Sequence, residues 1–348
     1  MRRKTLISGI GVVIALSLTA CGNSPTATSS EATTGSSGQT SAASAPAKVT
    51  KMTVGYPSPA AGYTDLYICV DEGIYAKNNL DVELVQLKSS SQLLSALSSG
   101  AVQIGSGVAA STAAGALKGV DLKYIGIPLP VLYLEMWGDA DITSPEQLKG
   151  KKVAVTPPGS QSSLAMEKLL TDLNMKDDVE LVHVADVAAE VAALENGSVN
   201  ALVTQPPTGT KTRDKGFHKI MDFTNYPVAA NAFAVMTDYI DKNKEAVAAF
   251  VKSEVECLAL LHKDKAKGVA SITKHLNLTD ASLAEYSYDY FEKIWAKVPT
   301  VQPDLIKASF EEAASKAKVD APADITKYVE NSFIEELEKS GFIDSLYK

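Results

Sequence analysis

The stretch from Met52 to Ile127 decides the fold. It reads, in order, MTVGY (52–56), PSPAAG (57–62), YTDLYICVDEGIYAKNN (63–79), LDVELVQL (80–87), SSSQLLSALSSG (89–100), AVQIGSG (101–107), VAASTAAGALKGV (108–120) and DLKYIGI (121–127). Short runs rich in β-branched residues alternate with longer runs whose apolar residues have helical spacing, which predicts strands alternating with helices. This alternation is typical of an α/β unit with a parallel sheet.

Three loops of this stretch follow predicted strands and lead into predicted helices. They cover residues 58–62, 88–92 and 105–111, are rich in Ser, Gly and Ala, and contain one charged side chain, Lys88. In open α/β sheets, ligands lie outside the carboxyl ends of the strands. Helix N-termini there present unpaired N–H groups. We therefore expect this stretch to form half of a small-molecule cleft.

The strand–loop–helix pattern returns after residue 140. LKGKKVAV (148–155) precedes a Ser-rich loop (156–163) and an apolar helix, and further strands follow before the chain becomes helical from Asn243 to its end. We predict an α/β fold of two lobes joined by two crossings, near residues 137–141 and 226–231. The first lobe would comprise 49–138 and 231–348, the latter with the C-terminal helices, and the second lobe 139–230.

Composition excludes several function classes. The chain has 348 residues, is 45% hydrophobic, and carries a net charge of −8. Such an acidic chain is a poor candidate for binding nucleic acid or anionic lipid. Arginine is limited to Arg2, Arg3 and Arg213. We therefore expect any anion site to use lysine, backbone N–H groups and hydroxyls.

The N-terminus reads as a targeting segment. Residues 1–20 have a basic start and an apolar core that is too short to span a bilayer, which predicts a secretory signal peptide. Leu18-Thr19-Ala20-Cys21 resembles the bacterial lipobox, so Cys21 is the predicted lipidation site, the alternative being an ordinary signal peptide. Residues 21–48 are nearly all Ser, Thr, Ala, Gly and Pro, which predicts a disordered tether with a mean reach of roughly 30 Å.

Two further cysteines, Cys69 and Cys257, fall on apolar faces of predicted helices. We interpret them as buried free thiols, with a disulfide between them as the alternative.

One segment resembles a known family. Residues 65–107, DLYICVDEGIYAKNNLDVELVQLKSSSQLLSALSSGAVQIGSG, are similar to the opening of substrate-binding proteins of ABC importers of the sulfonate, nitrate, taurine and thiamine-precursor class. LKGKKVAV (148–155) and ENGSVNA (195–201) resemble two later segments of the same family. The likeness extends to about Val235, and it implies a two-lobed periplasmic-binding-protein fold of type II.

The resemblance also implies a role. It implies an extracytoplasmic solute-binding lipoprotein, a monomer anchored by lipid to the bacterial cell membrane, that delivers a small solute to a permease and ATPase. It implies no enzymatic activity, no cofactor, no metal and no nucleic acid. The ligand contacts it implies come from loops of both lobes: Ser58, Ser90, Ser91, Gln92, Ser106, Gly107, Val108, Ser160, Gln161, Ser162 and Gln205.

Two positions depart from the family pattern. Gln205 stands where many members have glutamate, and Glu135 stands in a strand where the family usually has an apolar residue. Glu135 is either a surface-facing strand residue or a carboxylate under the cleft that pairs with a cationic ligand group, because a buried carboxylate needs such a partner. Four aromatic residues could stack on a flat ligand, with packing in the core as the alternative for each of them: Tyr63, Tyr67, Tyr133 and Trp137.

For the ligand we favour a small sulfonate-like organic anion. A heteroaromatic such as a thiamine pyrimidine precursor is the alternative, and an enzyme on the same fold is a further one. GSGVAA (105–110) formally fits a dinucleotide-binding pattern, but it follows the third strand of its unit rather than the first. The four histidines lack metal-ligand spacing.

Overall fold

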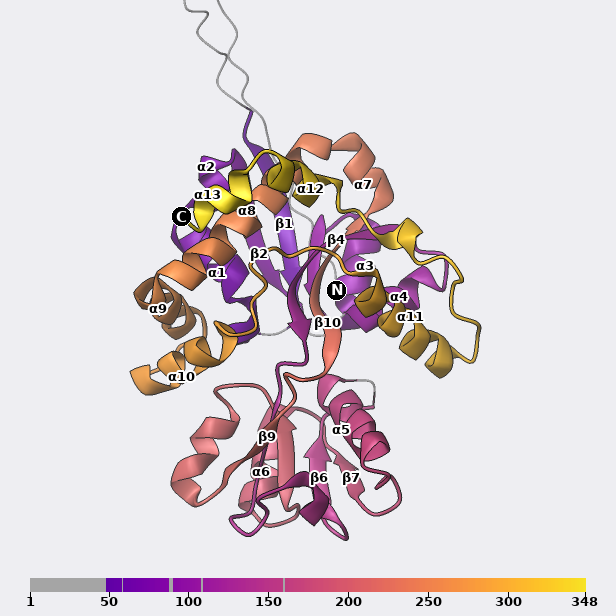
Figure 1. Cartoon of the computed structure of the whole chain (residues 1–348), viewed down its shortest axis with the longest axis vertical. Coiled ribbons are helices and arrows are strands. Elements are labelled where there is room, and N and C mark those ends of the chain that lie inside the picture. The colour runs from indigo at the N-terminus through magenta and orange to yellow at the C-terminus, as the bar shows by residue number, and fades with distance from the viewer. Residues whose placement is uncertain (1–47, 58, 88–89, 108, 159) are drawn as a thin grey trace, which may run out of the picture. The chain divides into compact units, whose positions relative to one another are not determined.

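The computed structural model describes residues 48–57, 59–87, 90–107, 109–158 and 160–348, with only the backbone of Ser90 and Ser91. Three predicted site residues, Cys21, Ser58 and Val108, lie outside the described residues, as do the predicted signal peptide and nearly all of the tether. The described residues form two five-stranded sheets flanked by helices (Figure 1). The predicted α/β architecture with two lobes is confirmed.

The first sheet combines the N-terminal strands with one strand from the returning chain. Strand β1 pairs in parallel with β2 and β3, whereas β10 runs antiparallel between β3 and β4. The pairing of β1 with β2 runs in register from Thr50–Leu80 to Tyr56–Gln86. The strands, in spatial order, are β2 (Leu80–Gln86), β1 (Thr50–Tyr56), β3 (Ile104–Gly107), β10 (Pro227–Met236) and β4 (Leu122–Val131).

The second sheet repeats this plan. Strand β6 pairs in parallel with β7 and β8, and β5 runs antiparallel between β8 and β9. The strands, in spatial order, are β7 (Glu180–His183), β6 (Lys152–Val155), β8 (Ala201–Thr204), β5 (Glu135–Gly138) and β9 (His218–Asp222). Each sheet therefore carries its antiparallel strand in the fourth position.

The chain passes between the sheets twice. It leaves the first sheet after Val131 and enters the second at Glu135, and it returns between Asp222 and Pro227. Both passages lie a few residues before the crossings expected from the sequence, at 137–141 and 226–231. The segment VLYLEMW, read from sequence as one strand, is therefore divided between the two sheets.

Helices cover both faces of the first sheet (Figure 1). One face is packed by a core that includes Leu66, Val247 and Phe250, the other by a core that includes Leu97 and Phe310. The helices on the first face are η1 (Ala61–Tyr63), α1 (Thr64–Asp71), α2 (Ile74–Lys77), α8 (Lys244–Lys263), α9 (Lys265–His275), α10 (Ala281–Phe291), α12 (Ser332–Lys339) and α13 (Phe342–Leu346). The helices on the second face are α3 (Ser90–Ser99), α4 (Ala109–Ala116) and α11 (Pro303–Ala317). Helix α7 (Thr237–Lys242) follows β10.

The second sheet is covered by fewer elements. These are η2 (Pro145–Leu148), α5 (Gln161–Asp172), α6 (Val187–Glu195) and η3 (Gly209–Lys215). Helix α6 begins at its N-cap Asp186, whose side chain accepts a hydrogen bond from the Ala189 amide at 2.9 Å. It ends at Asn196-Gly197, as the sequence predicts, and Gly197 takes the positive φ of +76° that glycine adopts without steric cost.

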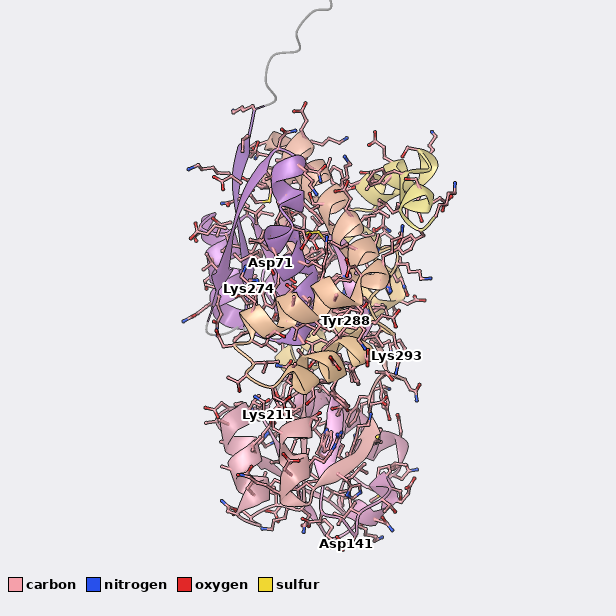
Figure 2. The ribbon with its side chains drawn as sticks, turned by 90° about the vertical axis from the view of Figure 1, so that its left-hand side faces the viewer. Asp71, Asp141, Lys211, Lys274, Tyr288 and Lys293 are labelled. Atoms are coloured by element: carbon pink, nitrogen blue, oxygen red, sulfur yellow. A yellow bond between two sulfur atoms is a disulfide. The ribbon has the colours of Figure 1, made fainter. Side chains whose placement is uncertain are left out.

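Long-range contacts fix α1 against the C-terminal helices. Cys69 of α1 and Cys257 of α8 form a disulfide across 188 residues of chain, so the interpretation as free thiols is wrong and the alternative holds. At the end of α1, Asp71 accepts hydrogen bonds from Ser271 at 2.7 Å and from Lys274 at 2.5 Å, and Figure 2 shows both Asp71 and Lys274. Within the described residues, none of the helices has the length and apolar character needed to cross a bilayer.

Candidate functional site

A cavity of about 790 Å³ lies between the two sheets. The first lobe contributes Pro57 after β1, Tyr63 of η1 and residues of α4 and α11. The second lobe contributes the β6–α5 loop, α6 and the end of β8. This volume suits a small organic molecule. We call it the interlobe cavity.

The β6–α5 loop forms a polar wall of the interlobe cavity. Ser160, Gln161 and Ser162 all line it, which places three predicted ligand residues together. The Ser160 side chain caps α5 by accepting a hydrogen bond from the Ser163 amide at 3.3 Å. The Ser162 hydroxyl accepts a hydrogen bond from the Thr156 amide at 2.9 Å. Ser160 and Ser162 are therefore oriented by hydrogen bonds within their own lobe.

Two tyrosines and Gln161 line the interlobe cavity where the two lobes meet. Tyr63 and Tyr133 line the interlobe cavity, and the Tyr133 hydroxyl donates a hydrogen bond to Asn231 Oδ1 at 3.2 Å. Burial raises the pKa of Tyr133 to about 12, although hydrogen bonds with Gln161 and Tyr63 reduce the effect. Gln161 Nε2 also donates to the Ala230 carbonyl at 3.2 Å, so a second-lobe side chain is bonded to first-lobe backbone. The tyrosines stay protonated at neutral pH and can donate hydrogen bonds.

Glu190 of α6 also lines the interlobe cavity, and sequence reasoning missed it. Its side chain is fully buried, with Oε1 accepting a hydrogen bond from Ser162 at 3.3 Å. Burial raises the pKa of Glu190 to about 8, against the lowering effects of Ser162 and the Thr156 amide. The available signal was a single carboxylate in the apolar run VAAEVAAL (187–194).

Of the other predicted ligand residues, some line the interlobe cavity and some do not. Gln205 lines the interlobe cavity, whereas Gln92, Ser106 and Gly107 do not belong to the described residues that line it. Gly107 instead pairs with Ala232 within the first sheet. The side chains of Ser90 and Ser91 are not among the parts of the chain that the structure describes, and neither are residues Ser58 and Val108.

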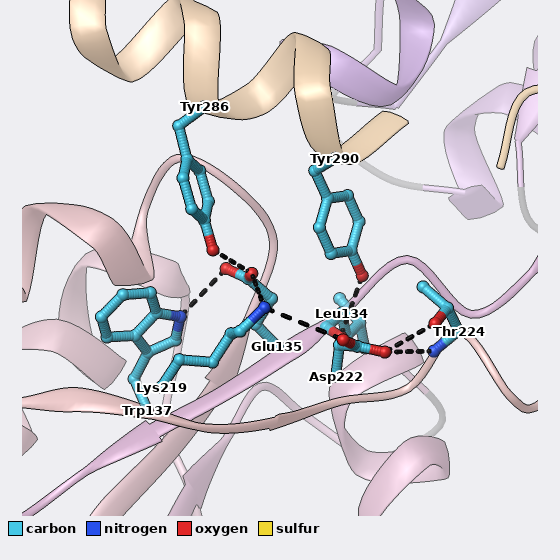
Figure 3. A network of polar contacts seen from close by, with 8 residues as sticks. All are labelled: Leu134, Glu135, Trp137, Lys219, Asp222, Thr224, Tyr286 and Tyr290. Carbon is cyan, nitrogen blue, oxygen red and sulfur yellow. Dashed lines mark hydrogen bonds and ion pairs between the residues drawn. The ribbon is translucent and has the colours of Figure 1, made fainter. Parts of the chain in front are cut away.

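Glu135 differs from both interpretations made from the sequence. It is fully buried in β5 rather than facing solvent, and it is not one of the described cavity residues. Its carboxylate accepts hydrogen bonds from Tyr286 and from Trp137 Nε1, the latter at 3.0 Å, and lies 3.3 Å from Lys219 Nζ (Figure 3). The cationic partner that a buried carboxylate requires is thus Lys219 of the same chain.

Charged groups of the first lobe lie at the cavity too. Lys118 at the end of α4 and Lys316 of α11 line it, and Lys316 pairs with Glu312 at 2.7 Å. The N-terminal turns of α4 and α5, from different lobes, both contribute lining residues. Helix N-termini and lysines favour an anionic ligand group. Across the described residues, His, Cys, Asp and Glu form no group of three or more that could hold a metal ion.

Comparison with known proteins agrees with this geometry. The sequence pattern described as NMT1/THI5 like matches residues 61–264. A protein of Escherichia coli (strain K12), provisionally named for binding aliphatic sulfonates, is 23% identical over 249 residues, which are 69% of this chain and 77% of that protein.

Solved structures share the fold. The periplasmic aliphatic sulphonate binding protein SsuA from Escherichia coli superposes with a TM-score of 0.69 at 19% identity, covering 82% of this chain and 99% of that chain. The alkanesulfonate-binding protein SsuA from Xanthomonas axonopodis pv. citri, bound to MOPS, gives 0.66 at 16% identity, covering 82% of this chain and 100% of that chain. Because the family pattern spans well over half of the sequence, this chain belongs to the NMT1/THI5-like family.

Proposed function

We propose that this protein is the solute-binding component of an ABC importer and that it captures a small sulfonate-like organic anion in the interlobe cavity. The observation that carries the proposal is that residues of both lobes, Tyr63 and Gln161 among them, line one cavity. The sulfonate-binding names of the similar proteins support the same ligand class.

Capture would follow from the two-lobed plan. A solute that contacts both lobes at once binds the closed arrangement better than the open one, and this differential affinity shifts the population toward closure. The closed form would then dock on a permease. Ser160, Gln161 and Ser162 would complete the hydrogen bonds around the anion, with the N-terminal turns of α4 and α5 supplying favourable electrostatics. Capture needs no turnover, so we expect binding without chemistry.

The test is a calorimetric and thermal-shift titration with ethanesulfonate. A true ligand present at 100 times its dissociation constant adds about 2.7 kcal/mol to the free energy of unfolding. Gln161→Ala should weaken binding at least tenfold, and Gln302→Ala, at the exposed N-cap of α11, should not. No binding of any sulfonate at millimolar concentration would overturn the ligand class. Conversion of the ligand, seen by mass spectrometry, would favour the enzyme instead.

A second ligand class has support in the aromatic wall. Tyr63 and Tyr133 both line the interlobe cavity and could contact a flat heteroaromatic ring. A pyrimidine that binds more tightly than every sulfonate would move the proposal to that class.

We further propose that the mature chain begins at a lipid-bearing Cys21 and that residues 22–48 tether a monomeric two-lobed body to the outer face of the cell membrane. Two acyl chains or more anchor a protein stably where one does not. Cys21→Ser should abolish labelling by a fatty-acid analogue and release the protein from membrane fractions. Retention at the membrane without label would contradict the anchor.

A further inference from the structure

Two tyrosines of α10 reach from the first lobe into the second. The helix itself is anchored in the first lobe, where Phe291 is buried in the same core as Phe250. Figure 3 shows Tyr286 and Tyr290 pointing from α10 toward the second lobe. The Tyr286 hydroxyl donates a hydrogen bond to the Glu135 carboxylate, and the Tyr290 hydroxyl donates to the Leu134 carbonyl at 3.2 Å. We call these two hydrogen bonds the α10 latch.

Tyr286 also packs among side chains of the second lobe. It contacts the apolar cluster of that lobe that contains Trp137 and Leu202. Arg213 Cζ of η3 lies 5.8 Å from the centre of the Tyr286 ring and 5.7 Å from that of the Trp137 ring. A guanidinium at this distance attracts an aromatic ring. Hydrogen bonding, apolar packing and a cation therefore all hold this first-lobe side chain against the second lobe.

Both acceptors of the α10 latch have a further partner inside the second lobe. The Glu135 carboxylate also accepts from Trp137 Nε1 at 3.0 Å and lies 3.3 Å from Lys219 Nζ. The Leu134 carbonyl also accepts from the Phe223 amide at 2.9 Å. A buried acceptor costs most when it is left with no partner at all. Since both acceptors keep a partner, α10 can separate from the second lobe at modest cost.

The α10 latch and the helical wall of the interlobe cavity lie on different sides of the hinge. Helix α10 packs on one face of the first sheet, and α4 and α11, which line the cavity, pack on the other. Figure 1 shows α10 on one side of the two crossings and α4 and α11 on the opposite side. A rotation about the crossings that brings the second lobe toward α4 and α11 therefore moves Glu135 away from α10.

We propose that Tyr286 and Tyr290 are positioning residues whose latch stabilises the ligand-free arrangement of the lobes and breaks when the second lobe closes on a solute. Neither tyrosine is among the described residues that line the interlobe cavity. The latch therefore lowers the affinity for the solute without touching it, because binding must supply the free energy that breaks the latch. This inference rests on the proposed capture of a solute between the lobes.

The first experiment is a calorimetric titration of the full mature chain with ethanesulfonate. The double variant Tyr286→Phe, Tyr290→Phe should bind about tenfold more tightly than the unaltered protein, because its two latch bonds are no longer lost on closure. Tyr288→Phe is the matched control on the same helix. Its hydroxyl donates to the Leu261 carbonyl inside the first lobe, so its affinity should stay within about twofold. Lost stability alone does not raise affinity, so a merely structural role predicts no gain.

The second experiment leaves both tyrosines in place. The chain has two tryptophans, and Trp295→Phe leaves only Trp137, which is buried beside Tyr286. Saturation with ethanesulfonate should shift the emission of Trp137 to longer wavelength, because separation of α10 uncovers one side of its ring. This readout does not require the double variant to fold.

The outcomes separate this inference from the proposed function. Unchanged or weaker binding by the double variant overturns the inference and leaves solute capture standing. Unchanged Trp137 emission at saturation does the same, since the latch would then persist in the bound protein. Absence of ethanesulfonate binding to the unaltered protein overturns the anion proposal, and the inference that rests on it is lost as well.

Discussion

Tyr286 of α10 donates a hydrogen bond to the carboxylate of Glu135 in β5, and the two residues belong to different lobes (Figure 3). Four residues further along α10, Tyr290 donates to the Leu134 carbonyl at 3.2 Å. One helix of the first lobe thus holds the segment where the chain enters the second sheet. Leu134 lines the interlobe cavity, whereas Tyr286 and Glu135 are not among its described lining residues, so the Tyr286–Glu135 bond can be altered without changing the described ligand wall.

Removing the Tyr286 hydroxyl should weaken this link. Tyr286→Phe deletes a hydrogen bond to a buried charged group, and we expect the free energy of unfolding to fall by about 1–2 kcal/mol. Urea denaturation monitored by tryptophan fluorescence measures the change. Tyr347→Phe, whose hydroxyl bonds the exposed Lys297 carbonyl at 3.0 Å, is the control and should stay within about 0.5 kcal/mol.

The Glu135–Lys219 pair predicts a non-additive pair of mutations. Lys219→Met should cost about 2 kcal/mol, less than the loss of a fully buried partner, because the Lys219 side chain is 36% exposed. The double variant Glu135→Gln, Lys219→Met should be more stable than Lys219→Met alone, since no unpaired buried charge is left. A double-mutant cycle in urea tests this. A double variant that is weaker than the single one would refute the pairing.

Stability should depend on pH through a buried carboxyl pair. Burial raises the pKa of Asp65, with the backbone amide of Leu66 partly offsetting it, and burial together with the charge of Asp65 raises the pKa of Glu254. The native state therefore keeps protons that the unfolded chain releases above about pH 4. Because the native state binds more protons, the free energy of unfolding should fall as pH rises from about 4 to neutrality.

Asp65→Asn isolates this effect. The amide cannot ionise, so the variant should lose less stability between pH 5 and pH 7 than the unaltered protein does. Melting temperatures across that range provide the measurement. Asp81→Asn, on the exposed side of β2, is the matched control and should keep the original slope. An unchanged slope in Asp65→Asn would exclude its titration as the cause.

The disulfide should contribute strongly to stability. Replacing Cys69 and Cys257 together by alanine should lower the free energy of unfolding by about 2–5 kcal/mol, because the bond constrains 188 residues of the unfolded chain. Reductant should lower the melting temperature of the unaltered protein and leave that of the double variant unchanged. If reductant had no effect on the unaltered protein, the stabilising role would be ruled out.

Local patterns sufficed for much of the fold. The alternation of strands and helices in residues 52–127, and its return after residue 148, predicted two α/β lobes, and the Ser160-Gln161-Ser162 loop was placed at a helix start where it lines the cavity. Periodicity and capping are local properties that the sequence carries directly.

Contacts between distant segments were not predictable in this way. The partners of Glu135 include Tyr286, 151 positions away, and nothing near Glu135 in the sequence indicates them. The pairing of Cys69 with Cys257 spans 188 positions and was likewise undetermined. Glu190 was missed because a lone charge on an alanine-rich helix usually faces solvent, and its burial depends on the neighbouring β6–α5 loop.

The position of strand β10 implies an order of folding during translation. This strand lies between β3 and β4, yet it emerges from the ribosome only after every strand of the second sheet. During translation, β4 therefore lacks the neighbouring strand that joins it to the rest of the first sheet. Residues 135–222, by contrast, already contain all five strands of the second sheet. The second lobe, which is inserted in the sequence of the first, can thus fold first. The first sheet stays incomplete until β10 has been synthesised.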